Sequence, residues 1–392
     1  MQTQNLKGSS NPLNGPRRYS LLGIAVAAAL AMPHTTLAQD DNNPGQELLL
    51  EEVVVTAQRR EQTLQEVPMA ISAFTEQALR DLQADDLGSI QGAVPNLNLV
   101  QGRGSSSSVN VFIRGVGQPD ALQTFDPAVG IYLDDVYISR IQGALFKLYD
   151  IERIEVLRGP QGTLYGKNTP GGAIRLITRT PGDEFEAAAS LIVGDYDRIE
   201  GAAYLSGPVS ENLSLGLSVL HNQRDGFVTD PITGLKYNDE YTSVARFKGA
   251  WDASENVQVL FSADYTEEDV ALTLGNAEAP LTSIDLGTGQ TVVRYVPPPG
   301  PWGFNSSMSG DGQQVESWGT NLTVIWDVKD DLLFKSITAY RELETNSFID
   351  IDATTLELGD VFVGLDQDQF SQEFQLLGNT DTVNWVAGLY YL

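Results

Sequence analysis

Cysteine is absent from this sequence of 392 residues, and histidine occurs only twice. Without cysteine, the chain can form neither disulfides nor thiolate metal sites. His34 lies in an N-terminal segment that we expect to be removed, which leaves His221 as the single histidine of the mature chain. The lack of cysteine and the single histidine argue against a His/Cys zinc cluster and against a Ser-His-Asp enzyme. We therefore expect no metal, no cofactor and no covalent catalysis.

Positive charge is also scarce, because 24 Lys and Arg stand against 52 Asp and Glu, and the net charge is −28. Proteins that bind nucleic acids need cationic surface to displace counterions from phosphates, so we expect no nucleic-acid partner. Long apolar runs are missing after residue 38 as well. The mature chain should accordingly contain no transmembrane helix.

The first 38 residues have the pattern of a secretory signal peptide. Arg17 and Arg18 precede the uncharged apolar run 21–32, and Thr36-Leu37-Ala38 offers a cleavage site. The run is too short to span a membrane, so we expect export with cleavage after Ala38. The paired arginines leave a twin-arginine signal open as an alternative.

The chain beyond the signal divides into a polar linker at 39–50, a mixed α/β domain at 51–182, and strands with loops from about 185 onward. Thr75 can cap a helix through about Ala84, and Asp85 or Asp86 can cap a second one that ends near Gly92. The apolar positions of these helices are Leu79, Leu82, Leu87 and Ile90. Short strands are predicted at 109–113, 129–133, 151–157 and 173–178.

Strict two-residue alternation marks the last section, as in Leu213, Leu215, Leu217 and Val219. Alternation over about ten residues, often with terminal aromatics, is typical of membrane β-strands with one lipid face and one wet face. Nine candidates follow: 185–194, 198–207, 212–223, 241–252, 256–266, 315–327, 332–344, 367–377 and 382–392.

The connections between these strands alternate between short and long. Tight polar turns lie at 207–211, 253–255, 328–331 and 378–381, and long links at 224–240, 267–314 and 345–366. Outer-membrane barrels have this rhythm, with the long loops facing outward. A soluble β-sandwich also alternates, but the 48 residues of 267–314 are unexpected in a compact soluble domain.

Three rival motifs fail on spacing or geometry. GTLYGKN resembles a phosphate-binding loop, but Gln161 and Asn168 stand where that loop needs Gly and Ser or Thr. DIDATT at 350–355 resembles a calcium loop, but Thr355 stands where its turn needs Gly. Asp134 and Asp135 are adjacent, and we expect them to point to opposite faces of a strand, which favours a structural role over paired catalytic acids.

The middle section resembles the plug domain of TonB-dependent receptors. The motifs are IRG (113–115), GIYLDDVYISR (130–140) and IERIEVLRGPQGTLYGKNTPGGAIRLITRTP (151–181), and the strand rhythm of 185–392 agrees with the barrel of that family. With this resemblance, EEVVVTA looks like the TonB box, whose residues are Glu51, Glu52, Val53, Val54, Val55, Thr56 and Ala57. A β-prone run beside a mobile linker suits pairing with the edge of another protein's sheet.

The resemblance implies a fold class and a division of the chain. We expect an α+β plug followed by an antiparallel transmembrane β-barrel of about 22 strands, of which about nine are present. The segments are a signal peptide (1–38), a linker (39–50), the TonB box (51–57), the plug (58–182) and part of the barrel (183–392). Since nine is odd and the sequence stops within a strand, we expect the chain to be incomplete and unable to transport alone.

The resemblance also implies function and partners. We expect a monomer in the outer-membrane lipid of a Gram-negative bacterium, energised by TonB and importing a scarce solute, a ferric siderophore being the first choice. Cobalamin, oligosaccharides and aromatic compounds remain alternatives within the family. A signalling receptor would need an extra domain before the box, and a passive porin would lack both box and plug.

Family members pair plug arginines with wall carboxylates, so that Arg114 and Arg158 are expected to pair with acids such as Glu373. Glycines 159, 162, 166, 171 and 172 should provide tight turns and close backbone approach. The positions that match the ligand-contacting plug loops are Arg103, Gly117 and Gln118. The long loop adds an aromatic cluster of Tyr295, Trp302 and Phe304 that could stack on a ligand.

Overall fold

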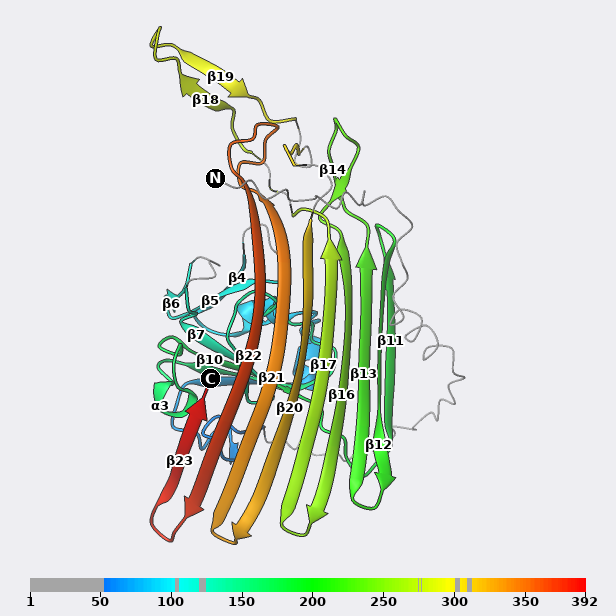
Figure 1. Ribbon diagram of the computed structural model, residues 1–392, viewed down its shortest axis with the longest axis vertical. Helices are drawn as coiled ribbons and strands as arrows, with labels where there is room; N and C mark the ends of the chain where they lie inside the picture. Colours follow the sequence, from blue (N-terminus) through cyan, green and yellow to red (C-terminus); the bar gives the residue numbers. More distant parts are fainter. Residues whose placement is uncertain are drawn as a thin grey trace, which may run out of the picture.

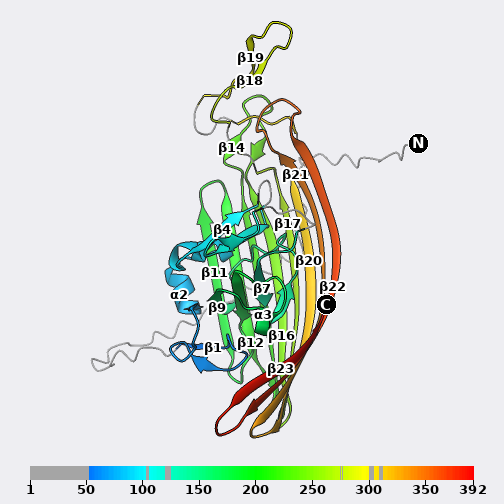
Figure 2. The same ribbon diagram turned by 90° about the vertical axis from the view of Figure 1, so that its left-hand side faces the viewer.

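The computed structural model describes residues 53–102, 106–119, 125–273, 275, 277–299, 304–308 and 312–392. Two parts are visible: an N-terminal domain, residues 53–178, and a wall, the nine-stranded sheet of residues 186–391. The N-terminal domain lies against the concave side of the curved wall (Figure 2). Within the described part of the chain, no helix has both the length and the apolar character needed to cross a membrane.

The N-terminal domain is built on a five-stranded mixed sheet of order β3-β9-β10-β7-β8. Its strands are β3 (Ile71–Thr75), β7 (Val129–Leu133), β8 (Val136–Ile138), β9 (Ile151–Arg158) and β10 (Gly172–Thr178). β10 pairs with β9 antiparallel and with β7 in parallel, so it is central. Nearly every position of β7 and β10 is buried and most of the residues are apolar, as expected for strands covered on both faces.

Three smaller elements surround this sheet. β4 (Leu97–Gln101), β5 (Val109–Ile113) and β6 (Val116–Gly117) form a three-stranded sheet, while β1 (Val54–Val55) pairs with β2 (Gln62–Thr63). The helices are α2 (Glu76–Asp81), the 3₁₀ helix η1 (Leu87–Ala93) and the short α3 (Gly162–Tyr165). The predicted strands at 109–113, 129–133, 151–157 and 173–178 are therefore confirmed.

The capping predictions hold at both helices. The Thr75 side chain accepts a hydrogen bond from Ala78 N, and Asp86 forms a capping box with Ser89. Leu79, Leu87 and Ile90 are buried in the core, but Leu82 is 43% exposed, because α2 ends at Asp81. The second helix is a 3₁₀ helix, a type that the sequence did not indicate.

The predicted roles of glycine in turns and close backbone contacts are confirmed at Gly172 and Gly166. A Cβ on Gly172 would lie 2.2 Å from Leu157 O, and Gly172 also has a φ of +151°. Gly166 closes α3 with a φ of +78°. Gly162, by contrast, has open space around its Cα, so glycine is not required there.

The wall is one antiparallel sheet whose strands follow the chain order (Figure 1). They are β11 (Glu186–Gly194), β12 (Arg198–Ser210), β13 (Leu213–Arg224), β16 (Glu240–Ser254), β17 (Val257–Val270), β20 (Gln313–Lys329), β21 (Leu332–Asp350), β22 (Asp360–Asn379) and β23 (Asn384–Tyr391). All nine predicted strands are present. Their centres were right, whereas β20, β21 and β22 are longer than predicted.

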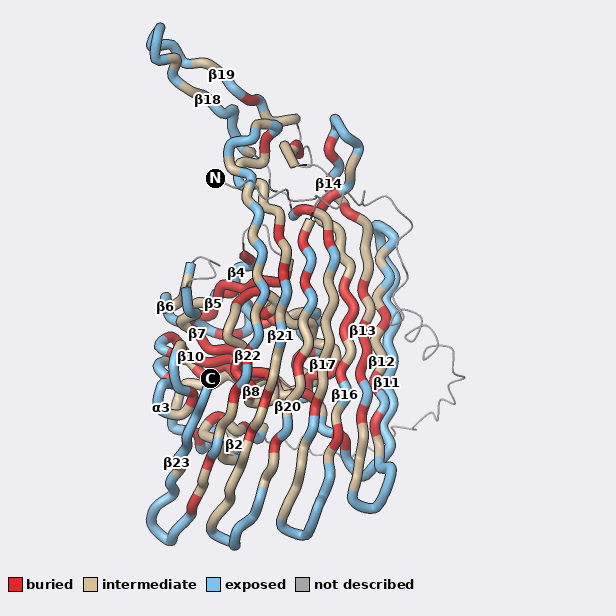
Figure 3. The backbone as a smooth tube through the Cα atoms, viewed as in Figure 1, coloured by how far each residue is buried: buried red, intermediate tan, exposed pale blue. Residues whose placement is uncertain are grey.

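Burial varies from residue to residue along the wall strands, as the predicted alternation requires (Figure 3). Large apolar side chains are exposed on the convex face, and the exposed fraction is 38 to 50% for Leu205, Leu217, Phe247, Trp251, Phe261 and Trp326. Small and polar side chains are buried on the concave face, among them Ser206, Ser218, Asn222, Thr242, Ser262 and Gln375. Hydrophobic-out, polar-in alternation is the arrangement of a membrane barrel wall.

Short turns and long connections lie at opposite ends of the wall (Figure 1). The long connections contain two hairpins, β14 (Val228–Thr229) with β15 (Lys236–Tyr237), and β18 (Leu281–Ile284) with β19 (Thr291–Tyr295). The predicted long link 345–366 is wrong, because β21 and β22 continue through most of it and leave only 351–359 between them.

Candidate functional site

Residues 53–57 are folded into the N-terminal domain. Val54 and Val55 pair with Thr63 and Gln62, and the side chain of Val55 is fully buried. Ala57 is 1% exposed, and its carbonyl accepts a hydrogen bond of 2.7 Å from the Tyr165 hydroxyl. The prediction of a β-prone run outside the plug is therefore corrected for these residues. Glu51 and Glu52 lie outside the described residues.

Thr56 connects this segment to buried charges of the central sheet. Its amide donates to Glu155 Oε1 at 2.9 Å, and its hydroxyl accepts from Arg175 at 2.7 Å and from Arg153 at 3.2 Å. Glu155 lies on β9 directly opposite Arg175 on β10, and both side chains are almost completely buried. A buried charge pair is tolerated only when it is well hydrogen-bonded, and Thr56 supplies part of that bonding.

Asp135 extends the network from Arg175 to the wall. It pairs with Arg175 at 2.7 Å, with Arg59 at 2.9 Å and with Lys335 of β21 at 2.7 Å. Burial by itself would raise the pKa of Asp135, but Lys335, Arg175 and Arg59 outweigh it and hold this pKa well below its usual range. The Asp135 carboxylate therefore forms ion pairs with β10, with the segment after β1 and with the wall.

The neighbouring Asp134 points to the wall as well. Its carboxylate accepts from the amide and hydroxyl of Thr178 and pairs with Lys248 of β16 at 3.2 Å. Both aspartates lie in the turn between β7 and β8 with φ values of 47° and 68°. The expectation that they lie on a strand and face opposite ways is therefore wrong. In a tight turn, consecutive side chains are not held to the two-residue alternation of a strand.

Further ion pairs join the N-terminal domain to the wall. Asp150 pairs with Arg246 of β16, with both side chains at most 5% exposed. Arg59 pairs with Glu373 of β22 at 3.3 Å, and Arg198 of β12 approaches Asp85 at 3.5 Å. In most of these pairs the acid comes from the N-terminal domain and the base from the wall, which is the reverse of the predicted polarity.

The predicted partners of Glu373 are corrected. Glu373 pairs with Arg59, and neither Arg114 nor Arg158 forms an ion pair with any described residue. Arg114 is exposed in the turn after β5 with a φ of 52°, and Arg158 ends β9 half-buried. Arg175 carries the same sequence signal, a single cation in an apolar strand, and it is the one that is buried and paired.

We expect substitution of Arg114 by Ala to change stability by no more than about 0.5 kcal/mol, as for an exposed side chain without a specific partner. Thermal unfolding of the purified protein would measure this. A loss of several kcal/mol in the free energy of unfolding would indicate that Arg114 is buried and paired, as first predicted.

The predicted ligand-binding residues are dispersed. Gly117 ends β6, where a Cβ would lie 2.3 Å from the ring of Phe112, so this glycine is structural. Gln118 follows it and is half-buried. Tyr295 and Phe304 are each only 7% exposed, and Phe304 packs with Val228, Tyr237 and Leu272. These two aromatics are buried between loops and cannot offer open stacking faces, while Arg103 and Trp302 lie outside the described residues.

A large cavity opens from the charged network toward the short-turn end of the wall. It has a volume of about 1040 Å³, and Thr56, Arg60, Asp135, Lys335 and Asp331 are among the residues that line it. Arg60 donates to Asn379 Oδ1 and to the Gly378 carbonyl beside the β22–β23 turn. The segment after β1 is therefore held at the boundary between the N-terminal domain and the wall.

Comparison with known proteins finds a family match for the N-terminal domain. Residues 63–173 match the TonB-dependent Receptor Plug Domain. The vitamin B12 transporter BtuB of Vibrio vulnificus is 30% identical over 226 residues, covering 56% of this chain and 35% of that protein. The pesticin receptor of Yersinia pestis is 30% identical over 223 residues, covering 56% of this chain and 31% of that protein.

Solved structures show the same fold. The ferric yersiniabactin uptake receptor FyuA of Yersinia pestis superposes with a TM-score of 0.63 at 22% identity, covering 82% of this chain and 48% of that one. The pyoverdine-bound receptor FpvA of Pseudomonas aeruginosa gives a TM-score of 0.65 at 16% identity, covering 86% and 43%. The chain thus spans about a third of these two curated relatives and less than half of these two solved ones.

Proposed function

We propose that this chain, whose residues 63–173 match the TonB-dependent Receptor Plug Domain, forms the plug and adjoining wall of an outer-membrane receptor that imports a scarce solute. The N-terminal domain would be the plug, and the nine wall strands would be part of a larger barrel. Residues 1–38 would direct export, and 39–50 would link the mature terminus to the box at 51–57.

The observation that carries this proposal is the continuous contact from residues 53–57 to the wall. Thr56 binds Glu155 and Arg175, Arg175 binds Asp135, and Asp135 binds Lys335 of the wall. We propose that TonB captures the box by strand addition and pulls on it. Force applied at the box would then reach the buried charges of the plug first and the pairs with the wall next.

Strand addition requires an accessible strand edge. β1 belongs to a two-stranded sheet, so one of its edges is not paired to any strand among the described residues, and Val54 is 46% exposed. Val55 and Ala57, in contrast, are buried. TonB would therefore engage the box from the side of Val54 and would have to extract Val55 and Ala57 before the plug could follow.

A ferric siderophore is the proposed cargo. The names of the yersiniabactin and pyoverdine receptors support this class, whereas the name of the B12 transporter favours cobalamin as the second candidate. The relatives are named as transporters and receptors, which supports import rather than catalysis. The plug match argues against a passive porin.

Ligand contact is proposed for Arg103, Gln118 and Trp302. Replacing Gln118 or Trp302 by Ala should weaken ligand binding by about 1 kcal/mol, roughly fivefold in Kd, as one lost contact does. Binding of a labelled ferric siderophore to intact cells would measure this, with Glu255→Gln at the β16–β17 turn as the control at the opposite end. If Arg103→Ala, Gln118→Ala and Trp302→Ala all left affinity unchanged, these loops would not form the ligand site.

A further inference from the structure

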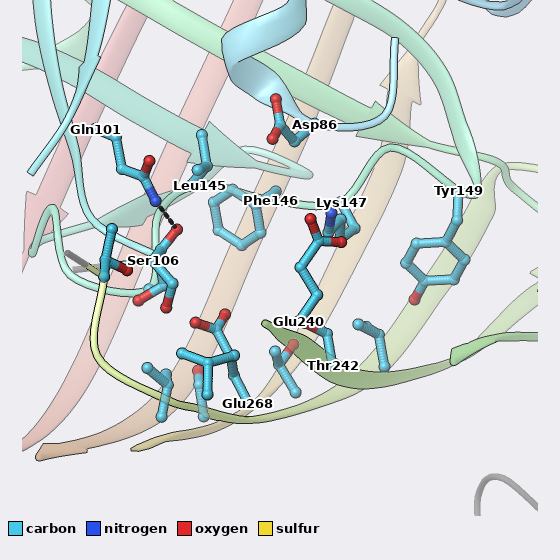
Figure 4. A pocket seen from close by; sticks show the side chains of 18 of the residues that line it. Asp86, Gln101, Ser106, Leu145, Phe146, Lys147, Tyr149, Glu240, Thr242 and Glu268 are labelled. Atoms are coloured by element: carbon cyan, nitrogen blue, oxygen red, sulfur yellow. Dashed lines mark hydrogen bonds between the residues drawn. The ribbon is translucent and has the colours of Figure 1, made fainter. Parts of the chain in front are cut away.

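A second cavity lies on the long-loop side of the charged network, between the N-terminal domain and the wall (Figure 4). Its volume is about 310 Å³. That size is at the lower end of the range for small-molecule pockets, about 300–1,000 Å³. Segment 143–149 forms one side, and residues of β16, β17 and β20 form the other.

Most charges around this cavity are already paired. Arg224 pairs with Glu240 at 2.9 Å, and Arg341 pairs with Asp264 at 2.7 Å. Lys147 and Glu268 also line the cavity, but neither forms an ion pair with a described residue. The lining contains five acids and four bases, and one of those bases, Arg246, is paired outside the lining with Asp150. The cavity therefore has an excess of negative charge.

Two oxygen atoms at this cavity, Glu268 Oε1 and the Tyr149 hydroxyl, are buried and have no hydrogen-bond partner among the described residues, and the same holds for Arg246 Nε. A buried carboxylate oxygen without a donor is costly, and a bound group with N–H donors would remove that cost. The two oxygen atoms belong to opposite sides of the cavity, because Tyr149 comes from the N-terminal domain and Glu268 from β17.

An aromatic ring completes this arrangement. Figure 4 shows Phe146 in the middle of the cavity, with the Glu268 carboxylate extending toward it from the wall. A cation held between a carboxylate and an aromatic face is favoured by the negative charge of the carboxylate and by the quadrupole of the ring. A compact ammonium or guanidinium group with an apolar body matches these features.

We propose that this cavity binds a small organic cation, with Glu268 as its counterion and Phe146 as its aromatic contact. Lys147 opposes this binding because it places a competing positive charge in the same cavity. The site goes beyond the proposed import of a siderophore, since it needs neither TonB nor the box. It rests on the proposed function only in placing the cavity inside the receptor.

The test uses the purified complete receptor in detergent and three probes of one shape: benzylammonium, benzyl alcohol and benzoate. Ligand-observed NMR titration should show benzylammonium binding at least about tenfold more tightly than benzyl alcohol, with benzoate weakest. Glu268→Gln should remove the preference for the cation, and Lys147→Gln should strengthen cation binding several-fold. Glu267→Gln is the matched control, because Glu267 neighbours Glu268 on the strand and faces the opposite side of the wall.

Three outcomes would overturn the proposal: equal binding of benzylammonium and benzyl alcohol, no binding of either, or unchanged cation binding in both Glu268→Gln and Lys147→Gln. Glu268→Gln should weaken cation binding and Lys147→Gln should strengthen it. If one variant folds poorly, the other still tests the proposal. Deletion of the box should leave cation binding intact. A failure of TonB-dependent uptake is therefore distinguishable from a failure of this site.

Discussion

Deleting Glu51–Ala57 from the receptor should abolish energised uptake while ligand still binds at the cell surface. The box is the proposed point of capture by TonB, and Thr56 is its connection to the buried pair Glu155–Arg175. Without the box, no force can reach the plug. Uptake of a labelled ligand should fall to the level of cells that lack TonB, and surface binding should stay within about twofold, which corresponds to well under 1 kcal/mol.

The deletion also removes buried contacts, so a control must separate lost capture from a loosened plug. Tyr165→Phe removes the hydrogen bond to the Ala57 carbonyl and leaves the box sequence intact. Such a bond contributes about 1 kcal/mol, so this variant should fold and transport. Normal uptake by the deletion variant would refute the assignment of the box. Loss of surface binding in that variant would instead show that residues 51–57 serve mainly to hold the plug together.

Replacing Asp135 by Asn should loosen the plug in the wall. Arg175 would keep Glu155 as a partner, and Arg59 would keep Glu373, but Lys335 has no other ion-pair partner among the described residues. Breaking a buried pair by removing one partner costs roughly 3–5 kcal/mol. We expect a clear fall in the thermal stability of the purified receptor and increased sensitivity of cells to large antibiotics.

A double variant tests whether Lys335 is the reason. Asp135→Asn combined with Lys335→Met removes both charges and should recover part of the lost stability. Asp81→Asn, in the exposed last turn of α2, is the control and should have almost no effect. An Asp135→Asn receptor that is as stable and as impermeable as the wild type would show that this pair does not hold the plug.

The loss of stability caused by Asp135→Asn should not depend on pH near neutrality. The pKa of Asp135 is depressed in the folded protein, so its contribution is complete above the pKa of a free aspartate, about 3.9. That contribution is lost only as the pH falls through the lower, folded-state pKa. The stability difference between wild type and variant should therefore be constant from about pH 5 to pH 8.

The sequence by itself determined the strands of the wall, four strands of the N-terminal domain and the starts of two helices. Alternation is a local property of consecutive residues, so it placed all nine wall strands and the face of Leu217 or Phe261 before any contact was known. Capping is equally local, which is why Thr75 could be assigned as one cap and the other narrowed to Asp85 or Asp86, of which Asp86 is the cap. The motifs at 113–115, 130–140 and 151–181 also identified the plug.

Only the tertiary structure decided which charges meet. Arg59 and Glu373 are 314 positions apart, and Asp135 and Lys335 are 200 apart, so their pairing depends on how the plug docks against the wall. The sequence signal of a lone cation in an apolar strand was shared by Arg114, Arg158 and Arg175. Folding of the N-terminal domain buried Arg175 against Glu155 and Asp135, and docking against the wall paired Arg59 with Glu373. The burial of Val55 and Ala57 could not be predicted from the sequence for the same reason. The residues that bury them, such as Tyr165, come from distant parts of the chain.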